Sequence, residues 1–252
     1  MSSGCMDVCE ISAKTAEELS ETTRKALALS IESSLRRFYG VTDCRVDLEG
    51  RTAEIVLLMP RHERIIRQFG AIDQVLPHDI LPVALDLADL PRAVKTAARS
   101  LFPEIIRELQ LEDEFRVWKK QTRRIISGVI RRRREDLVEV ELPGAMAILP
   151  KDARVPAEEP LYHAGSVLFF TISAVKRLPD RVLIRLSRSS RNLPARLFGF
   201  YLPMHRFVCV RRFIGQKSVV RTDANVRDRD VIRIREKVSA ELQGEIIELR
   251  PF

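Results

Sequence analysis

The chain has 252 residues, of which 45% are apolar, and this suits one large domain or two to three small domains with buried cores. No apolar run approaches the ~20 residues that a membrane-spanning helix needs, and residues 1–10 lack the features of a signal peptide, so we expect a cytoplasmic protein without membrane contact. The formal net charge of +8 is unevenly distributed along the chain. Residues 1–122 hold 17 Lys and Arg against 20 Asp and Glu, whereas residues 123–252 hold 26 Lys and Arg against 15 Asp and Glu. This asymmetry favours a protein partner for the first half and a polyanion for the second.

The first predicted element is a helix that ends before Gly40. Residues 15–18, Thr-Ala-Glu-Glu, form a capping box in which the threonine hydroxyl and a glutamate carboxylate each satisfy a free amide. Gly40 supplies the left-handed stop at the other end. Apolar residues at helical spacing between them are Leu19, Leu27, Ile31, Leu35 and Phe38. This pattern predicts a helix of about 25 residues with one apolar stripe.

A β-hairpin is predicted to follow this helix. Residues 43–49 alternate apolar and charged side chains, and residues 53–59 continue as a second strand after Gly50-Arg51. We expect one face of the hairpin to pack against the helix, because the apolar residues of both strands fall on that face.

Three further elements complete the first half. Residues 62–69 suit a short helix, and residues 80–87 alternate as a third strand, which Pro82 places at a sheet edge. A second long helix is expected over residues 91–118. Pro103 should kink or split this helix, because proline has no amide to donate and crowds the preceding turn.

Five short strands are predicted in the middle of the chain. They cover residues 125–132, 137–142, 145–149, 167–175 and 182–186. A long connection rich in Pro and charge follows the third strand. Five strands in about 65 residues with one long link suit a small Greek-key barrel of the OB type.

The remaining segment predicts a small α/β module. Residues 207–213 and 218–221 read as two strands, residues 231–242 as a helix, and residues 243–249 as a helix stop followed by a strand. The expected fold class is therefore α+β, with several domains.

Four short segments resemble the S1 domain of the NusA family of bacterial transcription elongation, termination and antitermination factors. They are Gly128-Val129-Ile130, Ala147-Ile148-Leu149-Pro150, Tyr162-x-x-Gly165 and Leu186-Ser187-Arg188. The segment from Asp89 through Glu108 is also similar to the long helix of the family's N-terminal domain, whereas residues 61–82 do not align. Asn192 to Pro203 resembles the family's linker.

The resemblance implies a division of the chain into three domains. Residues 10–122 would form an N-terminal domain that binds RNA polymerase, residues 123–190 an S1-type OB barrel, and residues 191–252 a linker with a KH-like domain. The KH-like domain is degenerate, because its Gly-x-x-Gly loop would fall on residues 229–232, where no glycine stands. We expect no second KH domain, since the chain ends at Phe252.

The predicted barrel is rich in arginine, and we expect these arginines to contact RNA phosphates. The densest run is residues 131–134, with Arg123 and Arg124 just before it, and a second cluster includes Arg185. The competing interpretation is a solvated strand end, because neighbouring residues of a strand face opposite ways. We expect one continuous cationic groove across the barrel.

Aromatic stacking would add to this charge, although few aromatic residues are available. Glu139 stands where related barrels often have an aromatic residue, and two of Tyr162, His163 and Phe170 are as well explained by the core or a turn. We therefore expect weak, mainly electrostatic binding of single-stranded nascent RNA. The expected RNA-binding residues are Arg131, Arg132, Arg133, Tyr162, His163, Arg185 and Arg188.

The resemblance also implies a polymerase-binding face in the first half. We expect it to involve four residues of the first helix, some on the face and some beneath it. They are Leu27, Ile31, Arg36 and Arg37.

Nothing in the sequence indicates an enzyme. The four histidines, His62, His78, His163 and His205, lie far apart without acid or thiol partners at ligand spacing, and no phosphate-binding glycine loop is present. Four scattered cysteines suit reduced, mostly buried thiols. We expect a monomer with no catalytic residues, metal, cofactor or small-molecule substrate.

The resemblance implies a non-catalytic, NusA-like transcription factor that binds RNA polymerase and nascent RNA and modulates pausing, termination or antitermination. Three alternatives stay open. The protein could be a shortened polymerase-binding regulator with little RNA affinity, an RNA-degradation enzyme, or a ribosome-associated RNA-binding protein.

Overall fold

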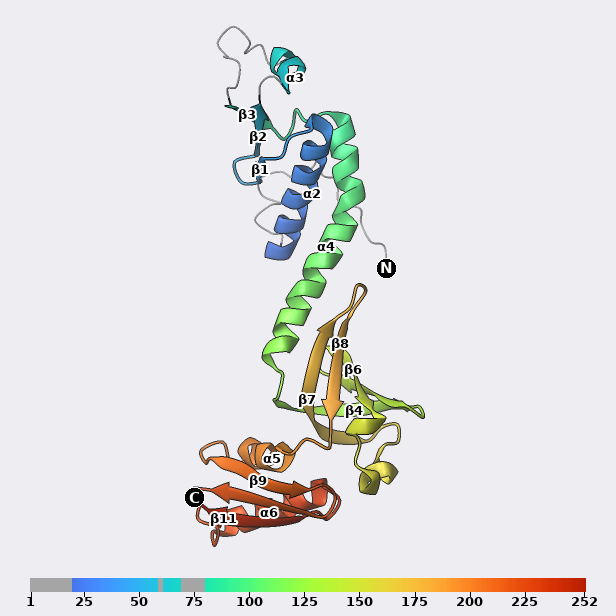
Figure 1. The fold of residues 1–252 in the computed structure, drawn as a ribbon, viewed down its shortest axis with the longest axis vertical. Helices are drawn as coiled ribbons and strands as arrows, with labels where there is room; N and C mark the ends of the chain where they lie inside the picture. The colour runs from blue at the N-terminus through green and yellow to red at the C-terminus, as the bar shows by residue number, and fades with distance from the viewer. Residues whose placement is uncertain (1–19, 59–60, 69–79) are drawn as a thin grey trace. The chain divides into compact units, whose positions relative to one another are not determined.

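The structure is a computed structural model that describes residues 20–58, 61–68 and 80–252. Contacts divide the chain into two compact units, Met1–Gln110 and Leu111–Phe252. Both units combine helices and strands, so the expected α+β class is confirmed (Figure 1). Among the described helices, none has the length and apolar character that crossing a membrane requires.

The first unit packs two helices against a three-stranded antiparallel sheet with the order β1-β2-β3. Its elements are α2 (Glu21–Tyr39), β1 (Cys44–Asp47), β2 (Thr52–Leu58), α3 (Glu63–Gln68), β3 (Ile80–Asp86) and the first part of α4 (Arg92–Lys120). Alternate residues of β2 are fully buried against α2, whose Leu27, Ile31 and Leu35 form the other side of the core. The predicted hairpin and edge strand are thus present.

The helix ends of the first unit differ in part from the prediction. Ser20 is the N-cap of α2, since its hydroxyl accepts a hydrogen bond from the Thr23 amide at 3.2 Å. Gly40 ends the helix at φ 68°, as expected. The capping box at residues 15–18 lies outside the described residues, and the described helix has 19 residues.

Helix α4 runs without interruption through Pro103, so the predicted split does not occur. Pro103 lies on an exposed side of the helix. Water can reach the backbone on this side of the helix, which reduces the cost of the amide that proline lacks.

The second unit contains a closed five-stranded barrel with the order β4-β5-β6-β8-β7, in agreement with the OB-type barrel expected. Its strands are β4 (Ile125–Arg133), β5 (Leu137–Leu142), β6 (Ala145–Pro150), β7 (Val167–Arg177) and β8 (Val182–Ser187). β7 pairs with β4 to close the barrel, and β6 pairs with β8 in parallel. Leu111 and Trp118 from the end of α4 join the barrel core.

Gly128 is needed where β4 approaches β5. A Cβ atom at this position would lie 2.6 Å from Val140 Cγ1 and 2.8 Å from Leu142 Cδ2, closer than real Cβ atoms come to other atoms. The glycine therefore permits the tight curvature at this corner of the barrel.

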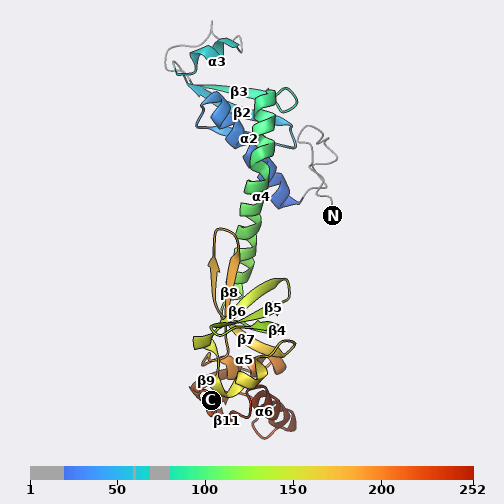
Figure 2. The same cartoon turned by 90° about the vertical axis from the view of Figure 1, so that its right-hand side faces the viewer.

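The C-terminal part forms a sheet with the order β11-β10-β9, in which β9 and β10 are antiparallel and β10 and β11 parallel. Its elements are α5 (Leu193–Tyr201), β9 (Phe207–Phe213), β10 (Lys217–Thr222), α6 (Arg229–Glu241) and β11 (Ile246–Pro251). Helix α5 lies between the barrel and this sheet and contacts both (Figures 1 and 2). Both helices share one apolar core with the sheet.

Two predictions for this part need correction or refinement. The segment taken as a linker contains α5, whose Leu193, Leu197 and Phe198 are buried at helical spacing. Residues 229–232, where a KH loop was sought, form the first turn of α6 behind the N-cap Asp228. The predicted domain boundaries at 122/123 and 190/191 stay predictions.

Candidate nucleic-acid interface

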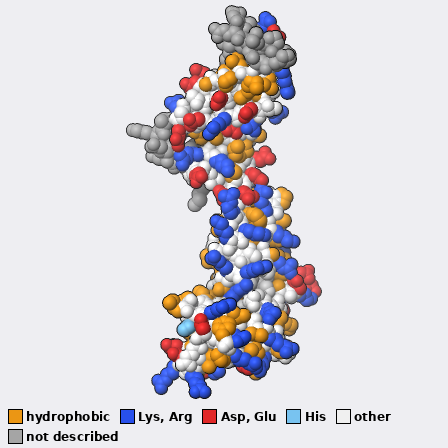
Figure 3. Space-filling model, turned by 60° about the vertical axis from the view of Figure 1, so that its left-hand side comes forward, with side chains coloured by type: hydrophobic (Ala, Val, Ile, Leu, Met, Phe, Trp, Pro, Cys, Tyr) orange, Lys and Arg blue, Asp and Glu red, His pale blue; other side chains and the backbone are white. Residues whose placement is uncertain are grey.

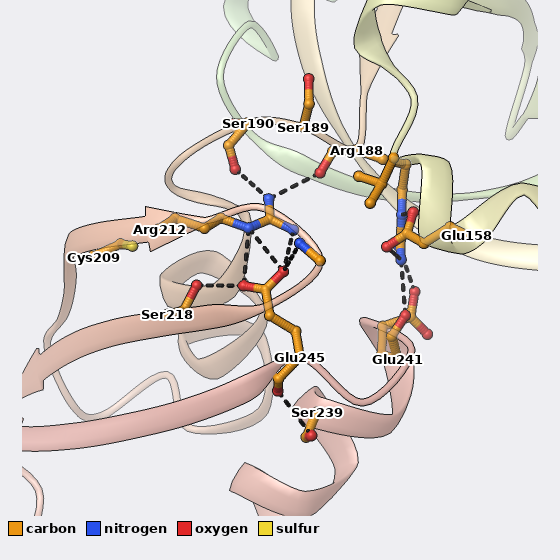
Figure 4. Close-up of polar contacts among 12 residues, drawn as sticks. Glu158, Arg188, Ser189, Ser190, Cys209, Arg212, Ser218, Ser239, Glu241 and Glu245 are labelled. Carbon is orange, nitrogen blue, oxygen red and sulfur yellow. Dashed lines mark hydrogen bonds and ion pairs between the residues drawn. The ribbon is translucent and has the colours of Figure 1, made fainter.

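Arg188, the last residue of the Leu-Ser-Arg segment, is fully buried where the barrel meets the C-terminal module (Figure 4). Its Nε and Nη2 each donate to one carboxylate oxygen of Glu158 at 2.7 Å. Nη1 donates to Glu241 Oε1 at 2.8 Å and to the Phe169 carbonyl at 2.7 Å, and Nη2 also donates to the Glu241 carbonyl at 2.8 Å. All five donors of the guanidinium are therefore occupied within the protein.

Burial alone would lower the pKa of Arg188, but hydrogen bonds and opposite charge from Glu158, with a further contribution from Glu241, raise the pKa above its ordinary value. The residue stays charged and joins three elements, namely the link before β7, β7 itself and the end of α6. The prediction that Arg188 contacts RNA is wrong, because no donor is left for a phosphate.

Tyr162 belongs to the same buried cluster. Its hydroxyl donates to Glu158 Oε2 at 2.8 Å and accepts from the Val155 amide at 3.1 Å, while the ring is 1% exposed. Burial, followed by the charge of Glu158, raises the pKa of this phenol. Tyr162 therefore cannot stack on a base, and its predicted RNA contact is also wrong.

A second buried arginine was not anticipated from the sequence. Arg212 in β9 pairs with Glu245, with Nη2 2.9 Å from Oε2, and both side chains are fully buried. Its Nη1 donates to the carbonyls of Arg188 and Ser190 at 2.9 and 2.6 Å (Figure 4). Glu245 also accepts from the Gly215 amide and the Ser218 hydroxyl. The two arginines thus fix the sheet to the end of the barrel.

The predicted barrel arginines that remain at the surface are mostly paired with acids. Arg131 forms an ion pair with Glu141, Arg133 with Glu159 at 2.5 Å, and Arg185 with Asp152. Arg134, beside them, pairs with Glu139 at 2.8 Å. Such exposed pairs contribute roughly 0–1 kcal/mol, so a phosphate can replace the carboxylate at small cost, but each acid reduces the local positive potential.

Two predicted residues are exposed and not bound to an acid in the described part of the chain. Arg132 has an exposed side chain in β4 and makes no ion pair there. His163 is exposed beside Ser166, whose hydroxyl lies 3.1 Å from the imidazole nitrogens.

The expected continuous cationic groove across the barrel stays a prediction, and the ion pairs place carboxylates among its arginines. Arg124 precedes β4 and Arg131 lies near its other end, seven positions further along the chain, which corresponds to roughly 23 Å of extended strand. On the face drawn in Figure 3, Lys and Arg side chains are spread over the second unit among apolar patches, without a single band.

The residues predicted to bind polymerase lie at different depths. Leu27 and Ile31 are each 4% exposed and line a cavity of about 250 Å³, with Arg51 and Lys95 in its wall. Arg36 and Arg37 are both exposed, but Arg36 donates to the Cys44 carbonyl at 3.1 Å and pairs with Glu32 at 3.5 Å. Arg37 is therefore the charged member of this set that has no ion pair among the described residues.

The histidines do not gather in the described residues, where no group of three His, Cys, Asp or Glu side chains is placed to hold a metal ion. His62 is buried, accepts from the Leu58 amide at Nδ1 (2.8 Å) and faces the Gly40 carbonyl with Nε2 (3.2 Å). Cys44 and Cys209 are buried free thiols. His78, Cys5 and Cys9 lie outside the described residues.

No protein-family model matches the chain, and no curated protein matches its sequence. Among solved structures, one similar chain is described as a multidomain protein with nucleic acid binding domains from Streptococcus pneumoniae TIGR4. It has 15% sequence identity and a TM-score of 0.24, and the match covers 37% of this chain and 35% of that chain.

Proposed function

We propose that the protein is a non-catalytic, NusA-like transcription factor that binds RNA polymerase through its first unit and nascent RNA through its second, and so modulates pausing, termination or antitermination. Its partners would be RNA polymerase and single-stranded RNA, and it would work as a cytoplasmic monomer without a cofactor.

The observation that carries this proposal is the structural role of the segments that resemble the NusA S1 domain. Gly128 permits the close approach of β4 to β5, and Ile130 exchanges backbone hydrogen bonds with Gly165 and Ser166 at 2.8 and 2.9 Å. Arg188 and Tyr162 form the buried cluster described above. The resemblance thus lies in residues that build the barrel, and it supports a shared architecture more directly than a shared RNA site.

RNA as a ligand is supported by charge. The second half of the chain holds 26 Lys and Arg against 15 Asp and Glu, and phosphate neutralisation by such side chains releases counterions. Small closed barrels of this type bind single strands by combining a cationic groove with stacked aromatic rings.

A direct test combines two measurements on the full chain. A tagged protein should capture purified bacterial RNA polymerase, and adding the protein to a single-round transcription reaction should change pause duration or termination efficiency. Absence of both capture and any transcriptional effect would overturn the proposal.

One observation favours a second candidate, a polymerase-binding regulator with little RNA affinity. Three of the predicted RNA-binding arginines, Arg131, Arg133 and Arg185, already have acid partners. Binding of a labelled single-stranded RNA across a salt series separates the candidates, because a phosphate-binding surface loses affinity steeply with salt. Polymerase capture without RNA binding at ~50 mM salt would favour the second candidate.

A further inference from the structure

An open groove of about 510 Å³ lies in the second unit, between the start of β4 and α5. Three arginines line it, Arg123 and Arg124 from the barrel side and Arg196 from α5, together with the aromatic rings of Phe200 and Phe207. No Asp or Glu is among the described residues that line it. This composition differs from the outer surface of the barrel, where arginines alternate with acids.

The three arginines have no ion-pair partner in the described part of the chain. The Arg124 side chain makes one long hydrogen bond, 3.4 Å from Nη1 to Gln121 Oε1. Burial, and then the positive charge of Arg123, lower the pKa of Arg196. His205, which also lines the groove, has its Nδ1 3.4 Å from Asp223 Oδ1. The groove thus holds several cations whose mutual repulsion a bound anion would relieve.

The backbone under these side chains is fixed by the barrel. The Arg123 amide donates to the Ile172 carbonyl at 2.8 Å, and the Ile172 amide donates to the Arg124 carbonyl at 3.0 Å. Arg196 is held within α5, whose Leu193, Leu197 and Phe198 are fully buried. The three charges are therefore presented from anchored positions, which reduces the entropy lost when a ligand binds.

Phe200 provides an aromatic surface in the same groove. Its side chain is 54% exposed, although it packs against Phe169 with ring centroids 5.0 Å apart and against Tyr201 at 5.2 Å. The two neighbouring rings hold it in place while part of it faces solvent. An exposed ring beside unpaired arginines is the combination by which proteins bind single-stranded nucleic acid.

We propose that this groove binds a short segment of single-stranded RNA, with its phosphates on Arg123, Arg124 and Arg196 and one base stacked on Phe200. The inference rests on the proposed function for the identity of the ligand, and it places the contact at the junction with α5 and away from the predicted barrel arginines.

The test is fluorescence anisotropy of a labelled RNA of about 12 nucleotides with the full chain and with Arg124→Gln/Arg196→Gln. Losing two phosphate contacts should reduce the steepness of the plot of log affinity against log salt concentration by about 1.4. At ~0.1 M salt this change corresponds to an affinity roughly 25-fold lower than that of the wild type. Phe200→Ala should weaken binding about five- to 150-fold with little change in slope. Arg124 and Phe200 are exposed and Arg196 is half-buried, and none of them forms an ion pair among the described residues, so circular dichroism should show that both variants fold.

Two comparison variants separate the possible outcomes. Arg64→Gln/Arg67→Gln in α3 makes the same change in net charge and should leave RNA affinity within about twofold, because neither residue lines the groove. If Arg131→Gln/Arg132→Gln abolishes binding while the groove variant binds like the wild type, the groove proposal is overturned and RNA binding stands. If the wild-type chain binds no RNA at ~50 mM salt, the RNA part of the proposed function fails as well.

A second measurement needs no variant. RNA carrying 4-thiouridine should crosslink, on irradiation of the wild-type complex, to the peptide that contains Phe200. Crosslinks confined to β5 and β6 would contradict the proposal.

Discussion

Arginine occupies two kinds of environment in the second unit, and the neighbouring carboxylates distinguish them. Arg188 and Arg212 are buried because Glu158, Glu241 and Glu245 supply enough acceptors to offset the loss of hydration. Arg131, Arg133 and Arg134 stay exposed and pair with single acids. Both kinds look alike in the sequence, since the acid partners of the buried residues lie about 30 to 50 positions away.

Replacement of Arg188 by methionine should strongly destabilise the second unit. The substitution leaves Glu158, which is 1% exposed, buried and charged without its partner, and breaking a buried pair costs about 3–5 kcal/mol. Urea unfolding followed by circular dichroism measures the change. The matched control is Arg185→Met, which removes an exposed pair with Asp152 and should cost at most about 1 kcal/mol. Equal effects of the two substitutions would contradict the role assigned to Arg188.

The Cys44 thiol should be unreactive at neutral pH. Burial, with the charge of Glu32 as the second cause, raises its pKa from 9.0 to about 11. At about pH 8.5 the thiolate fraction is then roughly 75-fold lower in the native protein than in the unfolded chain, and iodoacetamide should modify Cys44 correspondingly slowly. Mass spectrometry of the peptide containing Cys44, with and without urea, gives both rates. Equal rates would contradict the raised pKa.

The raised pKa of Cys44 also makes the stability of the protein depend on pH. Because the pKa is higher in the folded state, the folded protein holds the proton more tightly than the unfolded chain does. The contribution to stability is fully present below about pH 9 and is lost as the pH rises to about 11. Cys44→Ala should reduce this loss, and a denaturation series between these two pH values measures the difference.

At the scale of elements, periodicity predicted the strands well and the long-range contacts poorly. The alternation in β5 and the turn after it gave bounds identical to those observed, because one face of that strand is buried and the other half-buried. Helix α5 was missed because resemblance to a linker was preferred over its apolar spacing. The groove beside α5 could not be predicted at all, since it depends on bringing Arg123 and Arg196 together across 73 positions of sequence.

Gly128→Ala should destabilise the barrel through this packing of elements. The added methyl group would overlap Val140 and Leu142, and overpacking of this kind costs about 1–3 kcal/mol. Gly199→Ala is the matched control, because no atom lies within 4 Å of its added Cβ and alanine favours the helix by up to about 1 kcal/mol. Thermal unfolding should therefore shift in opposite directions for the two variants. A neutral Gly128→Ala would show that β4 can move away from β5.

At the scale of the whole molecule, charge distinguishes the two units. The near-neutral first half holds a small sheet covered by helices, whereas the basic second half holds the barrel and the C-terminal sheet. Net charge controls association with polyanions more than it controls fold. If one unit contacts polymerase and the other contacts RNA, single substitutions should affect one activity and leave the other intact.

Arg37→Glu in the full chain tests this separation. Arg37 is exposed in the last turn of α2 and has no ion pair in the described residues, so charge reversal should leave the fold intact while it weakens electrostatic attraction to a partner. We expect the affinity for RNA polymerase in the capture assay to fall about tenfold, which corresponds to a loss of about 1.4 kcal/mol of binding free energy. The affinity for RNA should stay within about twofold of the wild type. Arg124→Gln/Arg196→Gln should show the reverse pattern. If both variants lost both activities equally, the assignment of separate partners to the two units would be wrong.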